Sequence, residues 1–300
     1  MPPKRVLITG ISGLLGSNLA CSWRDRHEVL GIYNSHPVSL KGVRTIQADL
    51  LEPGVIDRVV RDFRPDLLVH CAALAHLDAC QENQVLARQM NTEMVARLRD
   101  ALKKPGVKLV YISTDAVYAG RAGRHTEDEK VSPANIYSKT KHLGESEVLQ
   151  YPGALVVRTA FYGWNIQSKR SFTESVISRL AARQPIRGFT DVMTSMIYTF
   201  DLADLLWKSA DKDLQGIYNF GSVSSLSKFD FIQSLARTFG QDASLVRPAS
   251  VDEFDLKAPR AKNLELDVSR LSLALNVKLP SMVDSIERFH KDHGRNGPLF

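Results

Sequence analysis

Short, nearly continuous apolar runs alternate along the chain with segments whose apolar residues recur every three or four positions. The first kind predicts buried strands and the second predicts helices. Strands are expected at residues 5–10, 28–33, 44–50, 66–74, 108–114 and 153–159. Helices are expected between them at residues 14–25, 53–63, 83–104 and 135–145. Because parallel strands covered on both faces have this pattern, the sequence predicts an α/β fold with a Rossmann-like, doubly wound parallel sheet.

The pattern loosens after Thr159. We expect a loop at 159–172, a helix at 201–210, a strand at 216–222, a helix at 228–240 and irregular structure at 247–267. The chain is therefore expected to have two parts. Residues 1–160 form a dinucleotide-binding Rossmann domain, and residues 161–300 form mainly a smaller C-terminal substrate-binding lobe, with some segments returning to the Rossmann sheet.

Composition narrows the class of protein. The 300 residues are 44% hydrophobic and 24% charged, with a net charge of +6, as in ordinary soluble globular proteins. The basic residues form no stripe, so we expect no nucleic-acid partner. No apolar run approaches the roughly 20 residues that cross a bilayer, so no membrane association is expected. Three cysteines without framework spacing favour a reducing cytoplasm, and no cluster has metal-ligand spacing.

A glycine-rich segment, TGISGLLGSNL, stands between the first predicted strand and helix. Its glycines suit a tight turn, close approach of backbone to a diphosphate, and close helix–strand packing. A helix N-terminus there favours phosphate groups. Because the spacing is GxxGxxG rather than GxGxxG, the alternative interpretation is an ordinary strand–turn–helix that binds no dinucleotide. The residues of this segment expected to contact a dinucleotide are Gly10, Ser12, Gly13, Leu14, Leu15 and Gly16.

The second predicted strand ends in GIYNSHP, where NAD-binding folds carry an acidic residue for the ribose 2′-hydroxyl. Here Asn34 and Ser35 can donate to a 2′-phosphate and His36 can add partial positive charge. This favours NADP(H) over NAD(H), with a polar turn as the alternative. Asp49, followed by Leu50, is expected beside the adenine, although a turn or helix-cap role for Asp49 competes.

A tyrosine and a lysine four residues apart, Tyr137 and Lys141, begin the helix predicted at 135–145 and share one of its faces. A tyrosine has an ordinary pKa of about 10, and a nearby ammonium lowers that pKa. Lys141 can also hold the nicotinamide ribose. Ser113 and Thr114 end a strand, where they can fix a carbonyl. The pattern predicts ketone reduction with Tyr137 as proton donor, and an accidental surface pair is the alternative.

In their order and spacing, TGxxGxxG, STDAVY and YxxxK resemble an extended short-chain dehydrogenase/reductase over essentially the whole chain. The resemblance implies that Thr114 polarises the ketone, that Tyr137 is the general acid tuned by Lys141, and that Ser113 assists. It also implies cofactor contacts from the strand end HCAAL, through Cys71, Ala72 and Ala73. Asn91 is matched to the helix-bending, water-holding asparagine of the superfamily, with an ordinary polar helix residue as an equal alternative.

The runs STDAVYAG…YSKTKHLGE, VVRTAFYG and APRAKNLELDVSRL are similar to segments of dTDP-4-dehydrorhamnose reductases. Ala116 stands where sugar-nucleotide 4,6-dehydratases carry a glutamate and these reductases a tyrosine. The similarity implies NADPH-dependent reduction at C4 of a nucleotide-activated 4-keto-6-deoxy sugar. The alternatives are an NAD-dependent sugar-nucleotide epimerase and a non-catalytic, NADP-binding regulatory subunit resembling the methionine adenosyltransferase beta subunit. The intact Thr114, Tyr137 and Lys141 disfavour the regulatory subunit.

The resemblance also implies a set of substrate contacts: Ser113, Asp115, Ala116, Phe161, Trp164 and Arg260. Core packing is the alternative for Phe161 and Trp164, and a place at the interface between the lobes is the alternative for Arg260. The cations available for a nucleotide diphosphate are Arg158, Lys169, Arg170, Arg187, Arg247 and Arg260. The nucleotide sugar is the expected partner, and a homodimer is left open.

Overall fold

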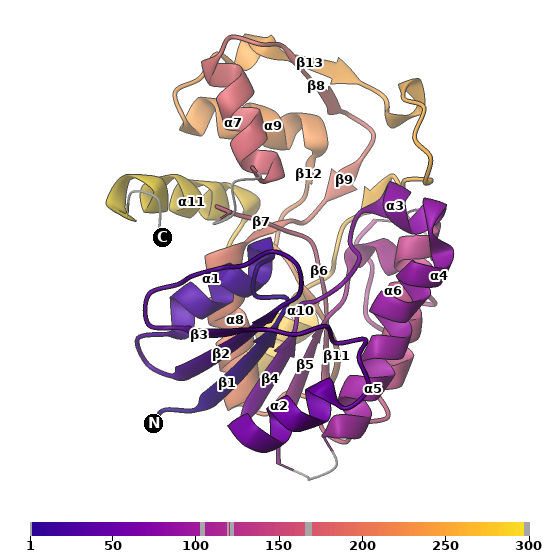
Figure 1. Ribbon diagram of the computed structural model, residues 1–300. Coiled ribbons are helices and arrows are strands. Elements are labelled where there is room, and N and C mark those ends of the chain that lie inside the picture. Colours follow the sequence, from indigo (N-terminus) through magenta and orange to yellow (C-terminus); the bar gives the residue numbers. More distant parts are fainter. Residues whose placement is uncertain (1, 103–105, 119, 121–122, 166–169, 297–300) are drawn as a thin grey trace.

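The computed structural model describes residues 2–102, 106–118, 120, 123–165 and 170–296, with residues 294–296 described by their backbone alone. Among them, a central sheet of seven parallel strands forms the larger part of the molecule (Figure 1). In spatial order the strands are β11 Gly216–Phe220, β6 Leu155–Thr159, β5 Lys108–Ile112, β4 Leu67–His70, β1 Arg5–Thr9, β2 Glu28–Tyr33 and β3 Arg44–Gln47. The predicted α/β, Rossmann-like class is confirmed, and the strand order reverses between β1 and β4.

Both faces of the sheet are buried, which explains the continuous apolar runs. Successive strand residues point to opposite faces, so Val6 and Ile8 belong to one core cluster and Leu7 to the other. The first face packs on α1 Leu14–Trp23, α8 Thr199–Asp211 and α10 Ser269–Leu275. The second face packs on α2 Val55–Phe63, α5 Met94–Ala101 and α6 Ile136–Val148.

Several element bounds differ from the predicted ones. β3 and β4 end at Gln47 and His70, so Asp49 and the segment after His70 lie in loops at the carboxyl edge of the sheet. The helix predicted at 83–104 is three segments, α4 Gln84–Arg88, a π-helical turn Gln89–Glu93 and α5; residues 103–104 lie outside the described residues. A short helix before it, α3 Leu77–Glu82, was not predicted. Asn83 separates α3 from α4, because its side chain accepts a hydrogen bond from the Leu86 N–H and caps α4.

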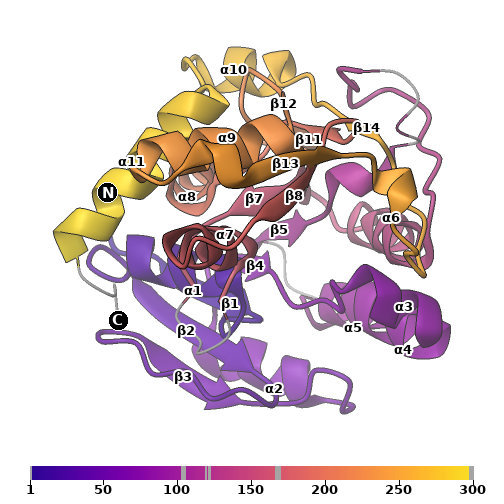
Figure 2. The same ribbon diagram turned by 90° about the horizontal axis from the view of Figure 1, so that it is seen from above.

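The second lobe lies over the carboxyl edge of the sheet (Figure 1). Its helices are α7 Phe172–Ala181, α9 Lys228–Thr238 and α11 Met282–Asn296. Figure 2 views the molecule from the side of this lobe. In this lobe, β8 Ile186–Phe189 pairs with β13 Val246–Ala249, and β7 Phe161–Tyr162 pairs with β10 Ile197–Tyr198. A third, three-stranded sheet has β9 Met193–Thr194 between β12 Leu226–Ser227 and β14 Asn263–Leu264. The loop predicted at 159–172 and the irregular segment at 247–267 therefore contain short strands. β11 returns to the central sheet.

We expect Gly16→Ala to destabilise the protein by about 1–3 kcal/mol, the usual cost of overpacking a tight contact. A Cβ at Gly16 would lie 2.5 Å from the Gly10 carbonyl oxygen and 2.9 Å from the Ile11 Cα, and both are backbone atoms that cannot rotate away. Thermal unfolding would measure the loss. Gly13→Ala is the matched control, because its nearest new contact is 3.2 Å; equal losses for the two variants would contradict the packing argument.

Candidate active site

In the turn after β1, the backbone of Gly10 packs closely against the backbone of the loop that follows β4. Gly10 has a φ of +70°, in the left-handed region that favours glycine. A Cβ there would lie 2.7 Å from the Ala72 N and 2.8 Å from the Ala72 Cα, in the loop after β4. The glycine therefore lets this turn pack directly against the loop after β4, at the switch point where open parallel sheets bind dinucleotides. The helix α1 begins directly after the turn, and its N-cap Gly13 makes no side-chain capping bond; a helix N-terminus of this kind favours phosphate groups.

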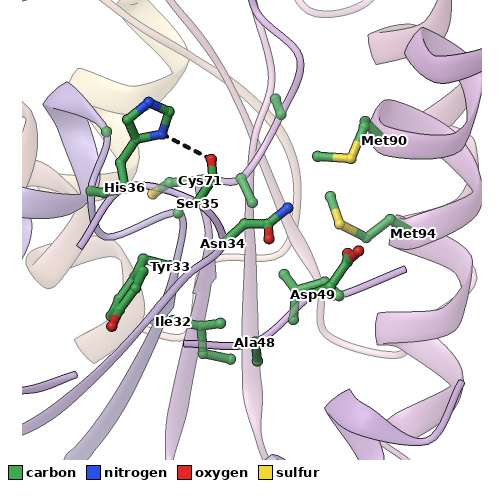
Figure 3. Close-up of a pocket in the computed structure, with 16 residues that line it drawn as sticks. Ile32, Tyr33, Asn34, Ser35, His36, Ala48, Asp49, Cys71, Met90 and Met94 are labelled. Carbon is green, nitrogen blue, oxygen red and sulfur yellow. Dashed lines mark hydrogen bonds between the residues drawn. The ribbon is translucent and has the colours of Figure 1, made fainter. Parts of the chain in front are cut away.

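A pocket of about 200 Å³ opens at this switch point. Figure 3 shows its lining, in which Asn34, Asp49, Met90 and Met94 extend toward a common space. The predicted cofactor residues that line it are Gly10, Ser12, Gly13, Asn34, Ser35, His36, Asp49, Leu50, Cys71, Ala72 and Ala73. These residues come from four strand ends, so the fold brings together the segments that the sequence pattern selected.

Five other predicted cofactor residues do not line this pocket: Leu14, Leu15, Gly16, Asn91 and Lys141. Leu15 is buried in the core between α1 and the sheet, and Gly16 lies under the Gly10 turn. The Leu15 side chain therefore packs in the core, and a contact of this residue with a dinucleotide stays a prediction. Asn91 lies in the π-helical turn Gln89–Glu93, and Lys141 lies on α6.

Methionines supply the side of the pocket opposite Asn34. Met90, from the π-helical turn, and Met94, from α5, extend into it (Figure 3). Sequence analysis missed both, because a methionine at helical spacing is indistinguishable from a core residue. Their polarisable thioethers suit the face of a flat heteroaromatic ring.

Three polar side chains of the pocket already have partners within the protein. Ser35 Oγ and His36 Nδ1 lie 3.0 Å apart and share a hydrogen bond. Asp49 Oδ1 accepts a hydrogen bond from the Leu51 N–H at 2.9 Å. This bond is the turn role that competes with a contact to the adenine. Its carboxylate nevertheless lines the pocket, so the turn fixes the side chain in place there.

Asn91 joins the loop after β4 to α6. Its Oδ1 accepts from the Leu74 N–H at 2.9 Å, and its Nδ2 donates to the Leu74 carbonyl and to Thr140 Oγ1, each at 3.1 Å. It lies in the π-helical turn, where the helix changes its hydrogen-bond period. The residue therefore lies at a helix irregularity, and its side chain makes three hydrogen bonds within the protein. Its match to the superfamily's asparagine stays a prediction.

The start of α6 fixes the proposed catalytic groups. Asn135 accepts from the Ser138 N–H at 2.9 Å and Ser138 Oγ accepts from the Asn135 N–H at 3.3 Å, forming a capping box. Tyr137 is the second residue of α6, and the Thr114 side chain lies close enough to its phenol to lower the pKa of that group. The structure thus brings together the hydroxyls of two residues that stand on β5's end and on α6.

The electrostatics of the pair differ from the sequence-based expectation. Burial raises the pKa of Tyr137 above its ordinary value, and the nearby Thr114 side chain only partly offsets this. Lys141 does not lower it, because its ammonium is directed elsewhere: Nζ donates to the Ile112 carbonyl at 2.7 Å and lies 4.0 Å from the centroid of the Tyr111 ring. Burial lowers the pKa of Lys141 to about 7. The phenol is therefore held in its neutral, proton-donating form.

Ser113 points away from the proposed reacting groups. Its hydroxyl donates to Glu145 Oε1 at 2.6 Å in the interior. Glu145 is 1% exposed and forms a two-point ion pair with Arg158, which is 2% exposed, through Nε at 3.0 Å and Nη2 at 2.8 Å. The Ser113 hydroxyl is thus engaged with Glu145, and its contact with a substrate carbonyl stays a prediction. Arg158 is buried rather than available to a diphosphate.

Two expected substrate contacts belong to packing. Trp164 stacks on Phe289 of α11 with ring centroids 4.2 Å apart, and its indole N–H donates to the Phe289 carbonyl. Phe161 is half-buried against the core on the α1 face. Both therefore follow the core-packing alternative. Asp115 is buried beside Thr114, whose hydroxyl donates to it at 3.2 Å, and Ala116 follows in the same 3-10 turn.

Arg260 ties the second lobe to α3. Its Nη2 lies 3.0 Å from Asp78 Oδ1, which also accepts from the Ala258 N–H. Asn135, the cap of α6, donates to the Pro259 carbonyl at 2.9 Å. Residues 258–260 thus contact both α3 and the start of α6, which carries Tyr137. These contacts are those of the interface alternative for Arg260.

The other candidate cations lie on the second lobe. Arg170 donates to Ser178 and Arg187 pairs with Glu253, whereas Arg247 is exposed on β13. Lys169 lies outside the described residues. Within the described ranges, no group of three side chains is arranged to hold a metal ion. The described helices also include none with both the length and the apolar character of a membrane span.

Comparisons with known proteins identify relatives of similar length. The chain is 29% identical over 283 residues to methionine adenosyltransferase 2 subunit beta of Danio rerio, covering 91% of this chain and 85% of that protein. It is 29% identical over 280 residues to dTDP-4-dehydrorhamnose reductase of Mycobacterium tuberculosis, covering 90% and 87%. The crystal structure of dTDP-4-dehydrorhamnose reductase from Bacillus anthracis in complex with NADP has a TM-score of 0.86 and 27% identity, covering 97% and 99%.

The family comparison spans nearly the whole sequence. Residues 4–294 match the model of the RmlD substrate binding domain, and this range includes the glycine turn, Thr114, Tyr137 and the second lobe. The chain therefore belongs to the RmlD substrate binding domain family.

Proposed function

We propose that the protein is an NADPH-dependent reductase of a nucleotide-activated 4-keto-6-deoxy sugar, with residues 161–300 supplying most of the substrate-binding lobe. The observation that carries the proposal is that the Tyr137 phenol and the Thr114 side chain lie together at the carboxyl edge of the dinucleotide-type sheet, close enough for Thr114 to lower the pKa of the phenol. The family, and relatives that include dTDP-4-dehydrorhamnose reductases, support the substrate class.

The chain's own groups account for the proton half of the reaction. A bound nicotinamide would supply the hydride to C4. Thr114 donates to the carbonyl oxygen and holds it against the phenol of Tyr137, which gives its proton to O4 as negative charge develops there. Lys141 lies one helical turn further on, where its Nζ donates to the Ile112 carbonyl and can also donate to a ribose hydroxyl of a bound dinucleotide. The raised pKa of Tyr137 supports the role of proton donor, since the phenol stays protonated at neutral pH.

The cofactor pocket supports NADP(H) rather than NAD(H), and a single substitution tests this. Asn34 is the pocket residue at the end of β2 where an acidic side chain would bind a ribose 2′-hydroxyl. We expect Asn34→Asp to lower kcat/KM for NADPH by about 10–100-fold, because a carboxylate would oppose the 2′-phosphate, and to improve use of NADH. Ser35→Ala, which removes only a hydrogen bond, is the control; unchanged NADPH preference in Asn34→Asp would exclude this segment from phosphate binding.

The proposed reaction is tested by following cofactor oxidation with dTDP-, GDP- and CDP-linked 4-keto-6-deoxy sugars, using NADPH and NADH in parallel. Turnover with at least one of these sugars is expected. Release of tightly bound NAD from the denatured protein, without net reduction, would favour the epimerase instead.

A second candidate is a regulatory subunit, favoured by the similarity to methionine adenosyltransferase 2 subunit beta. Dinucleotide binding without turnover of any sugar in the panel, together with a stable complex with a methionine adenosyltransferase catalytic subunit, would support it over the reductase.

A further inference from the structure

The ammonium of Lys141 lies against the face of an aromatic ring. Its Nζ is 4.0 Å from the centroid of the Tyr111 ring and donates to the Ile112 carbonyl at 2.7 Å. Lys141 is 2% exposed and Tyr111 is fully buried. Because the negative face of an aromatic ring attracts a cation most strongly where water is excluded, this contact favours the charged form of the lysine. Both contacts come from β5, which ends two residues before Thr114.

The Tyr111 ring is held in place by its own hydroxyl and by close packing of α6. The hydroxyl donates to the Asn91 carbonyl and to the Lys141 carbonyl, each at 3.3 Å. A Cβ at Gly144 would collide with the Tyr111 hydroxyl oxygen and with the Asn91 carbonyl oxygen. Glycine at this position therefore lets α6 pack directly on the tyrosine, and the ring has little freedom to move away from the ammonium.

The titratable side chains that neighbour Lys141 on β4, the loop after it, β5 and the start of α6 carry no negative charge at pH 7. Burial lowers the pKa of His70 to about 3 and raises the pKa of Cys71 to about 12. Burial also holds the pKa of Tyr111 and the pKa of Tyr137 above the ordinary value of a phenol. These four groups therefore provide no anion to pair with the ammonium.

Glu145, one helical turn after Lys141, carries a charge that attracts the ammonium. Its carboxylate is engaged with Arg158 through Nε at 3.0 Å and Nη2 at 2.8 Å, so the guanidinium balances most of that charge. Burial lowers the pKa of Lys141 to about 7. The charged state of the lysine therefore depends on its direct contacts with β5, and the Tyr111 ring is the larger of these contacts.

We propose that Tyr111 is a positioning residue for the reaction, whose ring keeps the Lys141 side chain in its ammonium form and directs it to a ribose hydroxyl of the dinucleotide. The inference rests on the proposed function for the contact with ribose. An ammonium has three N–H donors, and the Ile112 carbonyl accepts from one of them, which leaves donors for the ribose. A charged donor makes a stronger hydrogen bond than a neutral amine.

Fluorine atoms on the ring test the contact while nearly preserving its shape. Phenylalanine and its mono-, di- and trifluoro derivatives, placed at position 111, weaken the negative face of the ring stepwise. The readout is the pKa of Lys141, followed by the ¹³C chemical shift of the lysine ε-carbon and assigned with Lys141→Arg. We expect this pKa to fall with each added fluorine, by about 1 in total, because a desolvated cation–π contact is worth about that much.

Tyr111→Phe separates the ring from its hydroxyl. It removes the hydrogen bonds to the Asn91 and Lys141 carbonyls and keeps the aromatic face, so thermal stability should fall while the pKa of Lys141 changes little. Tyr111→Leu removes the face and should lower the pKa as far as the trifluoro ring does. If Tyr111→Phe alone produces the whole change and fluorine adds none, the ring contact is refuted.

The matched control is the same fluorinated series at position 151. Tyr151 is a buried tyrosine whose hydroxyl donates to the Val107 carbonyl, at the other end of the sheet. Fluorine there should leave the pKa of Lys141 unchanged. An equal fall of the pKa in both series would show a general effect of fluorination and would overturn the inference.

The pH dependence of kcat/KM for NADPH provides a second readout. If the ammonium binds the ribose, kcat/KM is highest below the pKa of Lys141 and falls as the pH rises through that value, near 7 in the unsubstituted protein. In the trifluorinated protein the fall should begin about 1 pH unit lower, so its kcat/KM should nearly equal that of Tyr111→Phe at about pH 5 and be about tenfold lower at about pH 8. A loss of the same size at every pH would indicate a merely structural residue and would contradict the proposal.

The lysine titration separates this inference from the proposed function, because it requires neither a sugar nor turnover. A stepwise fall of the pKa of Lys141 in a protein that reduces no keto sugar would uphold the ring contact and refute the reductase. Turnover together with a pKa that is constant across the fluorinated series would uphold the reductase and refute the contact. A constant pKa without turnover would refute both.

Discussion

Replacing Tyr137 with phenylalanine should slow the reduction step by about 10²–10⁴-fold, the usual contribution of a positioned general acid. The substitution removes one oxygen from a partly buried ring, so the capping box of α6 and the position of Thr114 should persist. Single-turnover measurements with NADPH would report the chemical step, and a dinucleotide titration should show unchanged affinity. Because burial raises the pKa of the phenol, the wild-type rate should not fall through its ionisation below about pH 10.

Tyr151→Phe is the matched control for this substitution. The Tyr151 hydroxyl donates to the Val107 carbonyl at 3.0 Å, at the opposite edge of the sheet, so its loss should leave turnover intact. A Tyr137→Phe enzyme that turns over like the Tyr151→Phe enzyme would remove the phenol from the mechanism.

Replacing Arg158 with methionine should destabilise the fold by about 3–5 kcal/mol, the cost of leaving one member of a buried ion pair without its partner. Burial alone would raise the pKa of Glu145, but hydrogen bonds from His142, Arg158 and Ser113 lower it, so the carboxylate is charged in the folded protein. Without the guanidinium, that charge would remain inside the protein with only neutral or exposed partners. Denaturant unfolding at neutral pH would measure the difference.

The double variant Glu145→Gln/Arg158→Met distinguishes a pair effect from lost packing. The glutamine carries no charge and can still accept from Ser113, so the double variant should be less destabilised than Arg158→Met alone. If the stability losses of Glu145→Gln and Arg158→Met, each measured alone, simply add in the double variant, the interaction between the two side chains is not the cause.

The sequence predicted the parts of the site that depend on local pattern. Strand, glycine turn and helix follow one another within residues 5–23, and Tyr137 and Lys141 share one helix, so spacing alone places them. The pocket residues at strand ends were predictable for the same reason, since parallel strands bring their carboxyl ends to one edge. Each of these inferences needs contacts only between neighbours in the chain, or the topology of the sheet.

The groups that sequence analysis missed depend on contacts between distant segments. Met90 and Met94 reach the pocket because a π-helical turn interrupts a helix that was predicted to be continuous. The bond from Ser113 to Glu145 redirects a hydroxyl that strand position alone assigned to the substrate. Hydrophobic periodicity carries no information about such pairings, because it describes which face is buried and not which partner covers it.

The position of α11 has a consequence for how the chain is made. The stacking of Trp164 on Phe289 completes the aromatic interior of the second lobe with a helix that is synthesised after the other described elements. The seven strands of the central sheet have all been synthesised by Phe220, so the nucleotide-binding half can fold while translation continues. Until α11 emerges, the nascent second lobe carries uncovered aromatic surface of the kind that chaperones bind.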